Sequence, residues 1–217
     1  MVMYLYLTFA LLSGIAITEI GVLFTRKNGA GSLESYCYIL LPSVFGTFGI
    51  VWKKTEARPK VQRVFLPNAK TQLINRIQAD FAGSKAASCE SILELGEQIQ
   101  RFLKGEPVKF DLDIAALETC SSFQRRVLLA EYGIPRGWIS TYGRISKSLG
   151  IAKGARAVGR VLSRNPFPII IPCHRAIRSN GELGGFQGGL RMKKVLLEHE
   201  GVCVSNEGKV LTTQIYY

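Results

Sequence analysis

Two short helices joined by a tight turn constrain the fold of this chain more than any other feature. Thr141 is placed to cap a helix over 142–149, and Gly150 ends it, because glycine readily takes the left-handed conformation at a helix C-terminus. A second helix is predicted over 153–164, where the Asn165–Pro166 pair stops it. This is the outline of a helix-turn-helix, and an ordinary solvated pair of amphipathic helices is the alternative.

The second predicted helix is basic along one face. Its arginines recur every fourth residue, and small side chains beside them would allow a partner to approach closely. The chain has a formal net charge of +12, and residues 121–217 hold 15 Lys and Arg against 5 Asp and Glu. This half is therefore predicted to face a polyanion such as a phosphate backbone, with a basic surface kept for solubility as the alternative.

The remaining elements predict an α+β fold. A small α/β N-terminal domain is followed by a mostly helical C-terminal domain with a helix-turn-helix and an active-site strand-loop. In the first domain, strands are expected at 36–41, 47–52 and 60–65, helices at 69–83 and 88–104, and an extended stretch at 109–113. The predicted divisions are a hydrophobic segment 1–30, the α/β domain 31–114, the mostly helical domain 115–205 and a tail 206–217.

The first residues are unusually apolar. Residues 3–24 carry one charge, Glu19, and are long enough to span a bilayer. Arg26 and Lys27 follow, so a spanning segment would leave the rest of the chain in the cytoplasm. A membrane anchor, a buried helix or strand pair, and translated sequence upstream of the true start are the three interpretations. A cytoplasmic protein, or a nuclear one in a eukaryote, is expected otherwise.

Cysteine and histidine usage argues against a metal site. The odd number of cysteines excludes complete pairing, and no C-x-x-C pair occurs, so a reducing compartment fits best. With only two histidines, His174 and His199, a zinc site has few ligands to draw on. No metal and no cofactor are predicted. The cysteines are Cys37, Cys89, Cys120, Cys173 and Cys203.

Cys173 follows a proline at the end of a short apolar run. Residues 169–171 are predicted as a buried strand, and Pro172 ends it because proline removes an amide donor. Cys173 is therefore expected at a fixed corner, where a thiol can face a pocket. Adjacent positive charge would favour the reactive thiolate, and His174 and Arg175 come next in the chain. A buried, inert cysteine beside a surface histidine is the alternative.

A second candidate group lies at the end of the last predicted helix. Glu200 opposes the helix dipole there, just before Gly201, so a separate use is expected, such as orienting a histidine. The cysteine, its neighbouring histidine and this carboxylate would then form a triad. Residues 181–189 form a loop with five glycines, which lets backbone amides approach a ligand or serves only as a connector.

Residues 120–203 resemble the O6-alkylguanine-DNA alkyltransferase family. The run Asn-Pro-Phe-Pro-Ile-Ile-Ile-Pro-Cys-His-Arg at 165–175 is similar to the active-site signature of that family. Residues 45–67 resemble its N-terminal domain only loosely, and residues 1–30 match nothing in it. Other matches follow in order at Phe123-Gln124, 134–137, 141–143, 155–159, the glycine-rich loop and 199–201.

The resemblance implies a DNA repair reaction with one turnover per molecule. Cys173 would accept an alkyl group, typically methyl, from O6 of guanine in double-stranded DNA and form a stable thioether. His174 would act as base through a water, Glu200 would orient it, and Tyr142 would donate to guanine N3. Asn165 would hold the segment that joins the recognition helix to the active site. The protein is expected to act as a monomer.

The resemblance also implies how the lesion is reached. The helix-turn-helix would enter the minor groove, and Arg156 would fill the gap left by the damaged nucleotide, because O6 inside a duplex cannot reach a buried thiol. The implied DNA-binding residues are Arg156, Ala155, Ala157, Gly159, Arg160, Arg164 and Thr141. The implied substrate-pocket residues are Ala176, Phe186, Gln187 and Gly188.

Three departures from the family pattern leave the range of accepted alkyl groups open. Ala176 replaces a larger aliphatic residue, Phe186 replaces a frequent tyrosine, and the zinc ligands of some relatives have no counterparts. The alternatives are an alkylation-sensing DNA-binding regulator and a Cys-His-Glu hydrolase. A non-catalytic lesion-recognition protein would lack Cys173.

Overall fold

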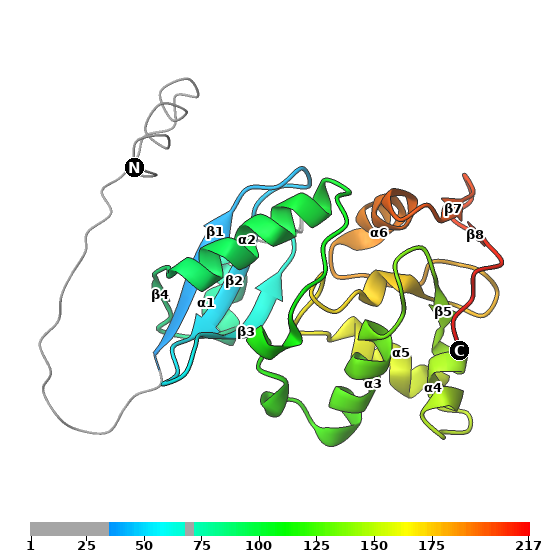
Figure 1. The fold of residues 1–217 in the computed structure, drawn as a ribbon, viewed down its shortest axis with the longest axis horizontal. Helices are drawn as coiled ribbons and strands as arrows, with labels where there is room; N and C mark the ends of the chain where they lie inside the picture. Colours follow the sequence, from blue (N-terminus) through cyan, green and yellow to red (C-terminus); the bar gives the residue numbers. More distant parts are fainter. Residues whose placement is uncertain (1–34, 68–71) are drawn as a thin grey trace, which may run out of the picture. The chain divides into compact units, whose positions relative to one another are not determined.

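The computed structural model of the chain describes residues 35–67 and 72–217 (Figure 1). The described residues form one compact unit. The apolar segment 3–24 and the start of the helix predicted over 69–83 lie outside the described residues. None of the described helices is both long and apolar enough to cross a bilayer.

The N-terminal part is a mixed sheet covered on both faces. Strands β1, β2 and β3 form an antiparallel meander, and the short β4 joins β1 in parallel, which gives the order β3-β2-β1-β4. The strand and helix bounds are Tyr36–Leu41 (β1), Phe48–Lys53 (β2), Lys60–Phe65 (β3), Leu73–Asp80 (α1), Lys85–Ala86 (β4) and Glu90–Leu103 (α2). The predicted strands and the helix over 88–104 are thus confirmed to within two residues at each end.

The two helices cover opposite faces of the sheet, as the ribbon in Figure 1 shows. On one face Phe48 and Ile50 pack in the same core as Ile99 of α2. On the other face Val51 packs with Ile77 of α1. Strand β2 is therefore buried on both sides, which explains its continuous apolar run in place of an alternating pattern.

The C-terminal part is mostly helical. Thr141 caps its helix as predicted, and Ser121 caps the helix that follows it, since each side-chain oxygen accepts from a backbone N–H of the first turn at 3.2 Å. Gly150 has φ +74°, the left-handed conformation that ends the helix before it. The elements are Ser122–Tyr132 (α3), Ser140–Thr141 (β5), Tyr142–Ser148 (α4), Ala155–Ser163 (α5), Ala176–Ile177 (β6), Gly189–His199 (α6), Cys203–Val204 (β7) and Val210–Leu211 (β8).

The strand predicted over 169–171 is wrong. Ile169 has φ +76°, and the amide of Ile171 donates back to the carbonyl of Phe167 at 2.8 Å, so the segment is a tight turn. The prolines at 168 and 172 lack the amide donors that a ladder needs, and for this reason the chain folds back on itself here. The strand of this region comes later, as β6, which pairs in parallel with β5.

The stretch predicted as extended over 109–113 also changes conformation before its end. The carboxylate of Asp111 accepts from the amide of Asp113 at 2.9 Å and caps a 3₁₀ turn over Leu112–Ile114. When an aspartate side chain accepts from the amide two residues later, it favours a turn over extended backbone.

Residues from both halves share one hydrophobic core, which includes Phe48 and Phe167. The amide of Val64 on β3 donates to the carbonyl of Pro166 at 2.8 Å. The last residues also pack against this unit, because Ser140 donates to the carbonyl of Tyr216 at 2.8 Å. The division of the chain at 114 and 205 stays a prediction.

Candidate active site and DNA-binding surface

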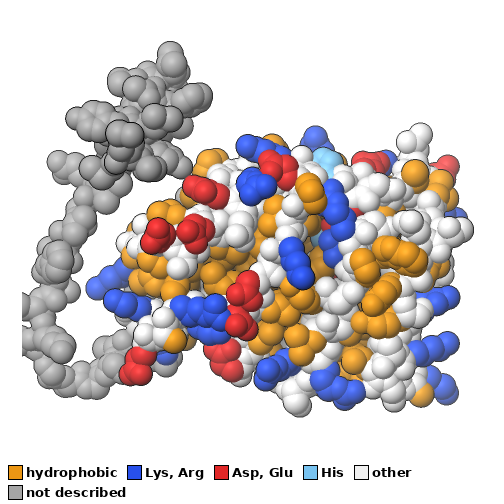
Figure 2. Space-filling view, in the orientation of Figure 1, with side chains coloured by type: hydrophobic (Ala, Val, Ile, Leu, Met, Phe, Trp, Pro, Cys, Tyr) orange, Lys and Arg blue, Asp and Glu red, His pale blue; other side chains and the backbone are white. Residues whose placement is uncertain are grey.

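Helices α4 and α5 form the predicted helix-turn-helix. Val158 and Leu162 of α5 are buried, while Arg156, Arg160 and Arg164 are exposed along the opposite side. Figure 2 shows Lys and Arg side chains along the edge of the molecule that carries α3 and α4, whereas most acidic side chains in this view lie over the sheet. The exposed face of α5 thus carries arginines and no acidic residue.

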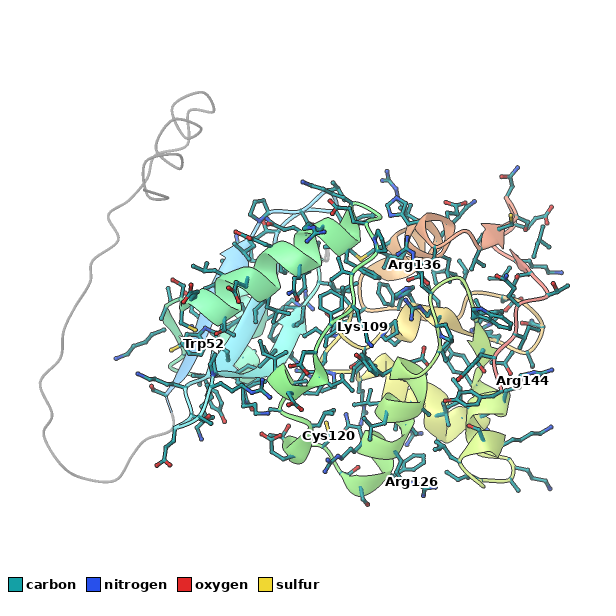
Figure 3. The ribbon with its side chains drawn as sticks, viewed as in Figure 1. Trp52, Lys109, Cys120, Arg126, Arg136 and Arg144 are labelled. Carbon is teal, nitrogen blue, oxygen red and sulfur yellow. The ribbon has the colours of Figure 1, made fainter. Side chains whose placement is uncertain are left out.

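The turn between the two helices is held by contacts from outside it. Arg126 of α3 donates to the carbonyl of Leu149 at 2.7 Å, and its position is labelled in Figure 3. Ser146 donates to the carbonyl of Ile151 at 2.5 Å. These bonds satisfy carbonyls at the end of α4 and fix the angle at which α5 leaves the turn.

A cavity of about 480 Å³ opens between α4, α5 and the loop after β6. The structure therefore brings Tyr142 of α4 and Arg156 of α5, for which the resemblance implies different roles, to one cavity. Gly184 is also required here: its φ is +68°, and a Cβ on it would lie 2.5 Å from Oη of Tyr142. The cavity is lined by Tyr142, Gly143, Ala155, Arg156, Gly159, Arg178, Ser179 and Asn180.

Cys173 begins a 3₁₀ turn directly after Pro172, so the predicted corner is present. Its residue is 6% exposed, and it is not among the residues that line the 480 Å³ cavity. Burial raises the pKa of the thiol to about 12, and the nearby Asn165 side chain offsets part of this rise. The thiol is therefore protonated at neutral pH and needs a proton acceptor to react as thiolate.

The next residue is held by the predicted carboxylate. Nε2 of His174 lies 3.0 Å from Oε1 of Glu200, and both side chains are buried. Although burial opposes its charge, the hydrogen bonds from His174 and Arg175 and the positive charge of Arg175 lower the pKa of Glu200 to about 2. An ionised carboxylate only accepts, so the proton between the two residues belongs on Nε2 of the imidazole.

This assignment leaves Nδ1 of His174 as a free acceptor. That atom is buried and has no hydrogen-bond partner within the described structure. Burial lowers the pKa of His174 more than Glu200 raises it, so the ring is neutral. Phe102 of α2 and Phe186 flank the ring, with centroids 5.7 Å and 6.2 Å away. The sheet domain thus helps to fix the orientation of the imidazole.

The side chain of Arg175 points in a direction that the sequence did not indicate. Its Nε and Nη2 both donate to the carboxylate of Glu200 at 2.8 Å, and Nη1 donates to the carbonyl of Ile134 at 2.5 Å. This bidentate pair keeps Glu200 ionised and fixed beside the imidazole. The arginine therefore acts on the carboxylate and not directly on the neighbouring thiol.

Asn165 bridges the end of α5 and the Cys173 turn. Its Nδ2 donates to the carbonyl of Ile171 at 3.1 Å, and its Oδ1 accepts from the amide of Phe167 at 2.9 Å. It thereby closes the turn that precedes Cys173. Because both contacts are local backbone bonds, the conformation of the turn depends on this one buried side chain.

The four predicted substrate-pocket residues are not all brought together. Phe186, Gln187 and Gly188 line a different cavity, of about 1180 Å³, next to α6 and the connection between β1 and β2. Oε1 of Gln187 accepts from the amide of Leu66 at 2.7 Å, and Ala176 is buried in β6, where its carbonyl accepts from Lys193 at 2.6 Å. Their assignment to a guanine pocket stays a prediction.

Two buried charged groups near the site were missed by the sequence reasoning. Glu131 on α3 and Lys193 on α6 are both fully buried. Burial raises the pKa of Glu131 to about 8 and lowers that of Lys193 to about 8. Each acts electrostatically on Cys173. Glu131 occupies a position between apolar residues of a helix, and a charged residue at such a position was the available signal.

The fold and the site together define an α+β helix-turn-helix protein with a buried cysteine beside a His-Glu-Arg cluster. Residues 122–202 match the model of the 6-O-methylguanine DNA methyltransferase, DNA binding domain. Methylated-DNA–protein-cysteine methyltransferases from Methanothermobacter thermautotrophicus and Methanosarcina acetivorans are 45% and 43% identical over 117 and 114 residues. These matches cover 54% and 52% of this chain and 65% and 72% of the relatives. The chain thus spans just under two thirds of the first relative's length.

Solved structures give the same result. The Mycobacterium tuberculosis O6-methylguanine methyltransferase matches with a TM-score of 0.60 and 28% identity, over 76% of this chain and 92% of that one. The Pyrococcus kodakaraensis O6-methylguanine-DNA methyltransferase matches with a TM-score of 0.58 and 25% identity, over 77% and 99%. This chain belongs to the methylated-DNA–protein-cysteine methyltransferase family. The predicted family and fold class are confirmed.

Proposed function

We propose that this protein repairs DNA by transferring an alkyl group from O6 of guanine to its own Cys173, once per molecule. The observation that carries the proposal is the buried cluster next to that cysteine, in which Arg175 holds Glu200 and Glu200 holds His174. This arrangement leaves one imidazole nitrogen free as a proton acceptor. A solved relative from Mycobacterium tuberculosis is in complex with DNA, which supports DNA as the partner.

The proposed reaction balances as a displacement at saturated carbon. The thiol proton of Cys173 passes towards Nδ1 of His174, directly or through a water. The sulfur then attacks the alkyl carbon, an S–C bond forms, and the C–O6 bond breaks. The electron pair of that bond goes to O6 of the purine, which takes up one proton and remains in the DNA as guanine. Thiol plus O6-alkylguanine thus become thioether plus guanine.

Tyr142 is proposed as the donor to the departing purine. Burial raises the pKa of its hydroxyl to about 12, so it is protonated and available to donate. It lines the 480 Å³ cavity together with Arg156 on the recognition helix. We propose that an extruded guanine enters through this cavity and that Arg156 takes its place in the stack, because a paired base keeps O6 inside the duplex.

Intact-mass measurement tests the reaction. After incubation with an oligonucleotide that contains O6-methylguanine, we expect one added methyl group per molecule, mapped to the peptide with Cys173. Cys173→Ala should gain no mass, and Cys203→Ala, which removes an exposed thiol, should gain the same mass as the unaltered protein. Turnover beyond one equivalent would contradict the proposal and favour a hydrolase.

A second test separates base extrusion from chemistry. Arg156→Ala should slow repair of duplex DNA far more than reaction with free O6-benzylguanine, since only the duplex reaction requires a flipped nucleotide. Single-turnover rates on the two substrates measure this difference. Equal losses on both would show that the substitution disturbs the fold and not the extrusion step.

We further propose that the protein acts as a monomer.

Fractionation of cells that carry the full chain or a chain lacking residues 1–27 tests whether residues 3–24 form a membrane anchor. The alternatives are a buried helix or strand pair and translated sequence upstream of the true start. Activity that stays with membranes only in the full chain would support an anchor.

A further inference from the structure

A second basic cavity, of about 360 Å³, lies where the sheet domain meets the end of the recognition helix. It is separate from the cavity beside Tyr142 and contains none of its residues. Its walls come from β3, α1, the C-terminal end of α5 and the glycine-rich loop. The lining residues are Arg63, Phe65, Arg76, Ala79, Asp80, Ser163, Arg164, Asn165 and Gln187.

Two of its arginines are held in place. The guanidinium carbons of Arg63 and Arg76 lie 5.6 Å and 5.4 Å from the centroid of the same ring, Phe65. Arg76 also donates to the carbonyl of Leu66 at 2.9 Å, and Arg63 pairs with Asp80. Stacking on an aromatic ring keeps both groups extended into the cavity while their remaining N–H donors stay available.

The cavity has a surplus of positive charge. Three arginines and one carboxylate, that of Asp80, line it. Among the described residues Asp80 lies within ion-pair distance of Arg63 but not of Arg76 or Arg164. Burial lowers the pKa of Arg76, the charge of Asp80 offsets part of this, and the charge of Arg63 lowers it further. A bound anion would offset both effects, and a phosphate offers the acceptor oxygens that guanidinium donors fit.

This cavity continues the basic stripe of α5. Arg156, Arg160 and Arg164 recur every fourth residue on the exposed side of the helix, and Arg164 at its end is also part of the cavity wall. A polyanion that follows the stripe therefore reaches Arg76 and Arg63 next. A small free anion would not need this continuity, whereas a nucleic-acid backbone would.

We propose that this cavity binds a phosphodiester group of the same DNA duplex that α5 engages, so that the sheet domain is part of the DNA-binding surface. The inference rests on the proposed function, which supplies the duplex. Its chemistry is charge-assisted hydrogen bonding from Arg76, Arg63 and Arg164 to one backbone phosphate, without reading of base sequence.

Duplex length distinguishes this site from the recognition helix. A short duplex of about 5 base pairs, closed as a hairpin, is about 17 Å long and spans little more than α5, which is about 14 Å long, whereas a duplex of about 20 base pairs extends well past it. We expect Arg76→Ala to weaken binding of the long duplex about tenfold at low salt and to leave the short duplex unchanged. The slope of log affinity against log salt should fall by about 1 for the long duplex.

Two further variants make the result decisive. Arg76→Gln keeps a donor for Leu66, so it should fold where Arg76→Ala does not and lose affinity for the long duplex in the same way. Arg101→Ala is the matched control, because Arg101 is an exposed arginine on α2, the helix on the opposite face of the sheet. It should bind both duplexes like the unaltered protein.

The outcomes separate this proposal from the proposed function. Equal affinities of Arg76→Gln and the unaltered protein for the long duplex, or equal losses on both lengths, would overturn the phosphate site. Failure of the unaltered protein to accept a methyl group would instead overturn the repair reaction. Rates with free O6-benzylguanine should stay normal in all three variants, because none of these arginines lies beside Cys173.

Discussion

Two buried carboxyl groups near Cys173 are held in opposite protonation states. Glu200 accepts from both Arg175 and His174, and these partners lower its pKa to about 2. Glu131 is also buried, but neither of its oxygens has a hydrogen-bond partner within the described structure. Burial raises its pKa to about 8, although the charges of Lys193 and Arg175 offset part of this rise. The same residue type is thus ionised where donors surround it and neutral where they do not.

The comparison shows how the protein keeps charge near a buried thiol under control. On the Glu200 side the ionised group serves to orient an imidazole. On the Glu131 side a neutral carboxyl avoids further negative charge near Cys173, whose pKa an ionised Glu131 would raise. The predictions that follow alter these two carboxyl groups and their partners in turn.

The largest effect is expected from Glu200→Gln. The substitution leaves Arg175 buried without its bidentate partner, so stability should fall by about 3–5 kcal/mol in urea unfolding at pH 7. The alkyl transfer rate should fall about 10²- to 10⁴-fold because the imidazole loses its charged acceptor, which would stabilise the ring as it takes up the thiol proton. Glu106→Gln removes an exposed partner of Arg101 and should change neither quantity appreciably. A Glu200→Gln protein with normal rate would show that the His-Glu pair is not used in transfer.

The ionisation of Glu200 should also appear in the dependence of stability on low pH. The folded-state pKa of Glu200, about 2, lies below its ordinary value of 4.5, so its contribution is fully present above pH 4.5 and is lost as pH falls towards 2. Unfolding free energy measured across this range should decline more steeply for the unaltered protein than for Glu200→Gln. Parallel curves would mean that Glu200 is not ionised in the folded state.

A smaller and opposite effect is expected from Glu131→Gln. The folded-state pKa of Glu131, about 8, is raised above 4.5, so the unfolded chain loses this proton first and stability falls as pH rises from 4.5 to 8. The variant should match the unaltered protein near pH 4 and exceed it at pH 8 by an amount on the order of 1–4 kcal/mol. A difference that is the same at both pH values would indicate a packing effect instead of titration.

The smallest effects concern the thiol itself. Glu131 raises the pKa of Cys173 and Lys193 lowers it, so Glu131→Gln and Lys193→Met should shift the pH dependence of transfer to O6-benzylguanine in opposite directions. Rates measured between pH 6 and 10 would show the two profiles displaced to lower and higher pH, respectively. Shifts of the same sign would mean that the substitutions act through packing and not through charge.

The local structure of the helix-turn-helix was predictable because its signals are local. Thr141 caps α4 and Gly150 takes a positive φ, and both properties belong to single residues. The turn before Cys173 was mispredicted as a strand because an apolar run of three residues has the same composition in a turn and in a strand. The prolines at both ends were the better guide, since each removes a ladder donor.

The sequence by itself determined which residues are chemically suited to the reaction and in what order they occur. It indicated Cys173 at a corner and a histidine next to it. It also indicated a carboxylate that opposes the dipole of its own helix and was therefore expected to orient a histidine. Only the tertiary structure decided the charge on each group, because a pKa depends on which donors lie within hydrogen-bonding distance after folding. The pairing of Arg175 with Glu200 and the lack of a hydrogen-bond partner for Glu131 both follow from contacts between residues that are distant in the sequence.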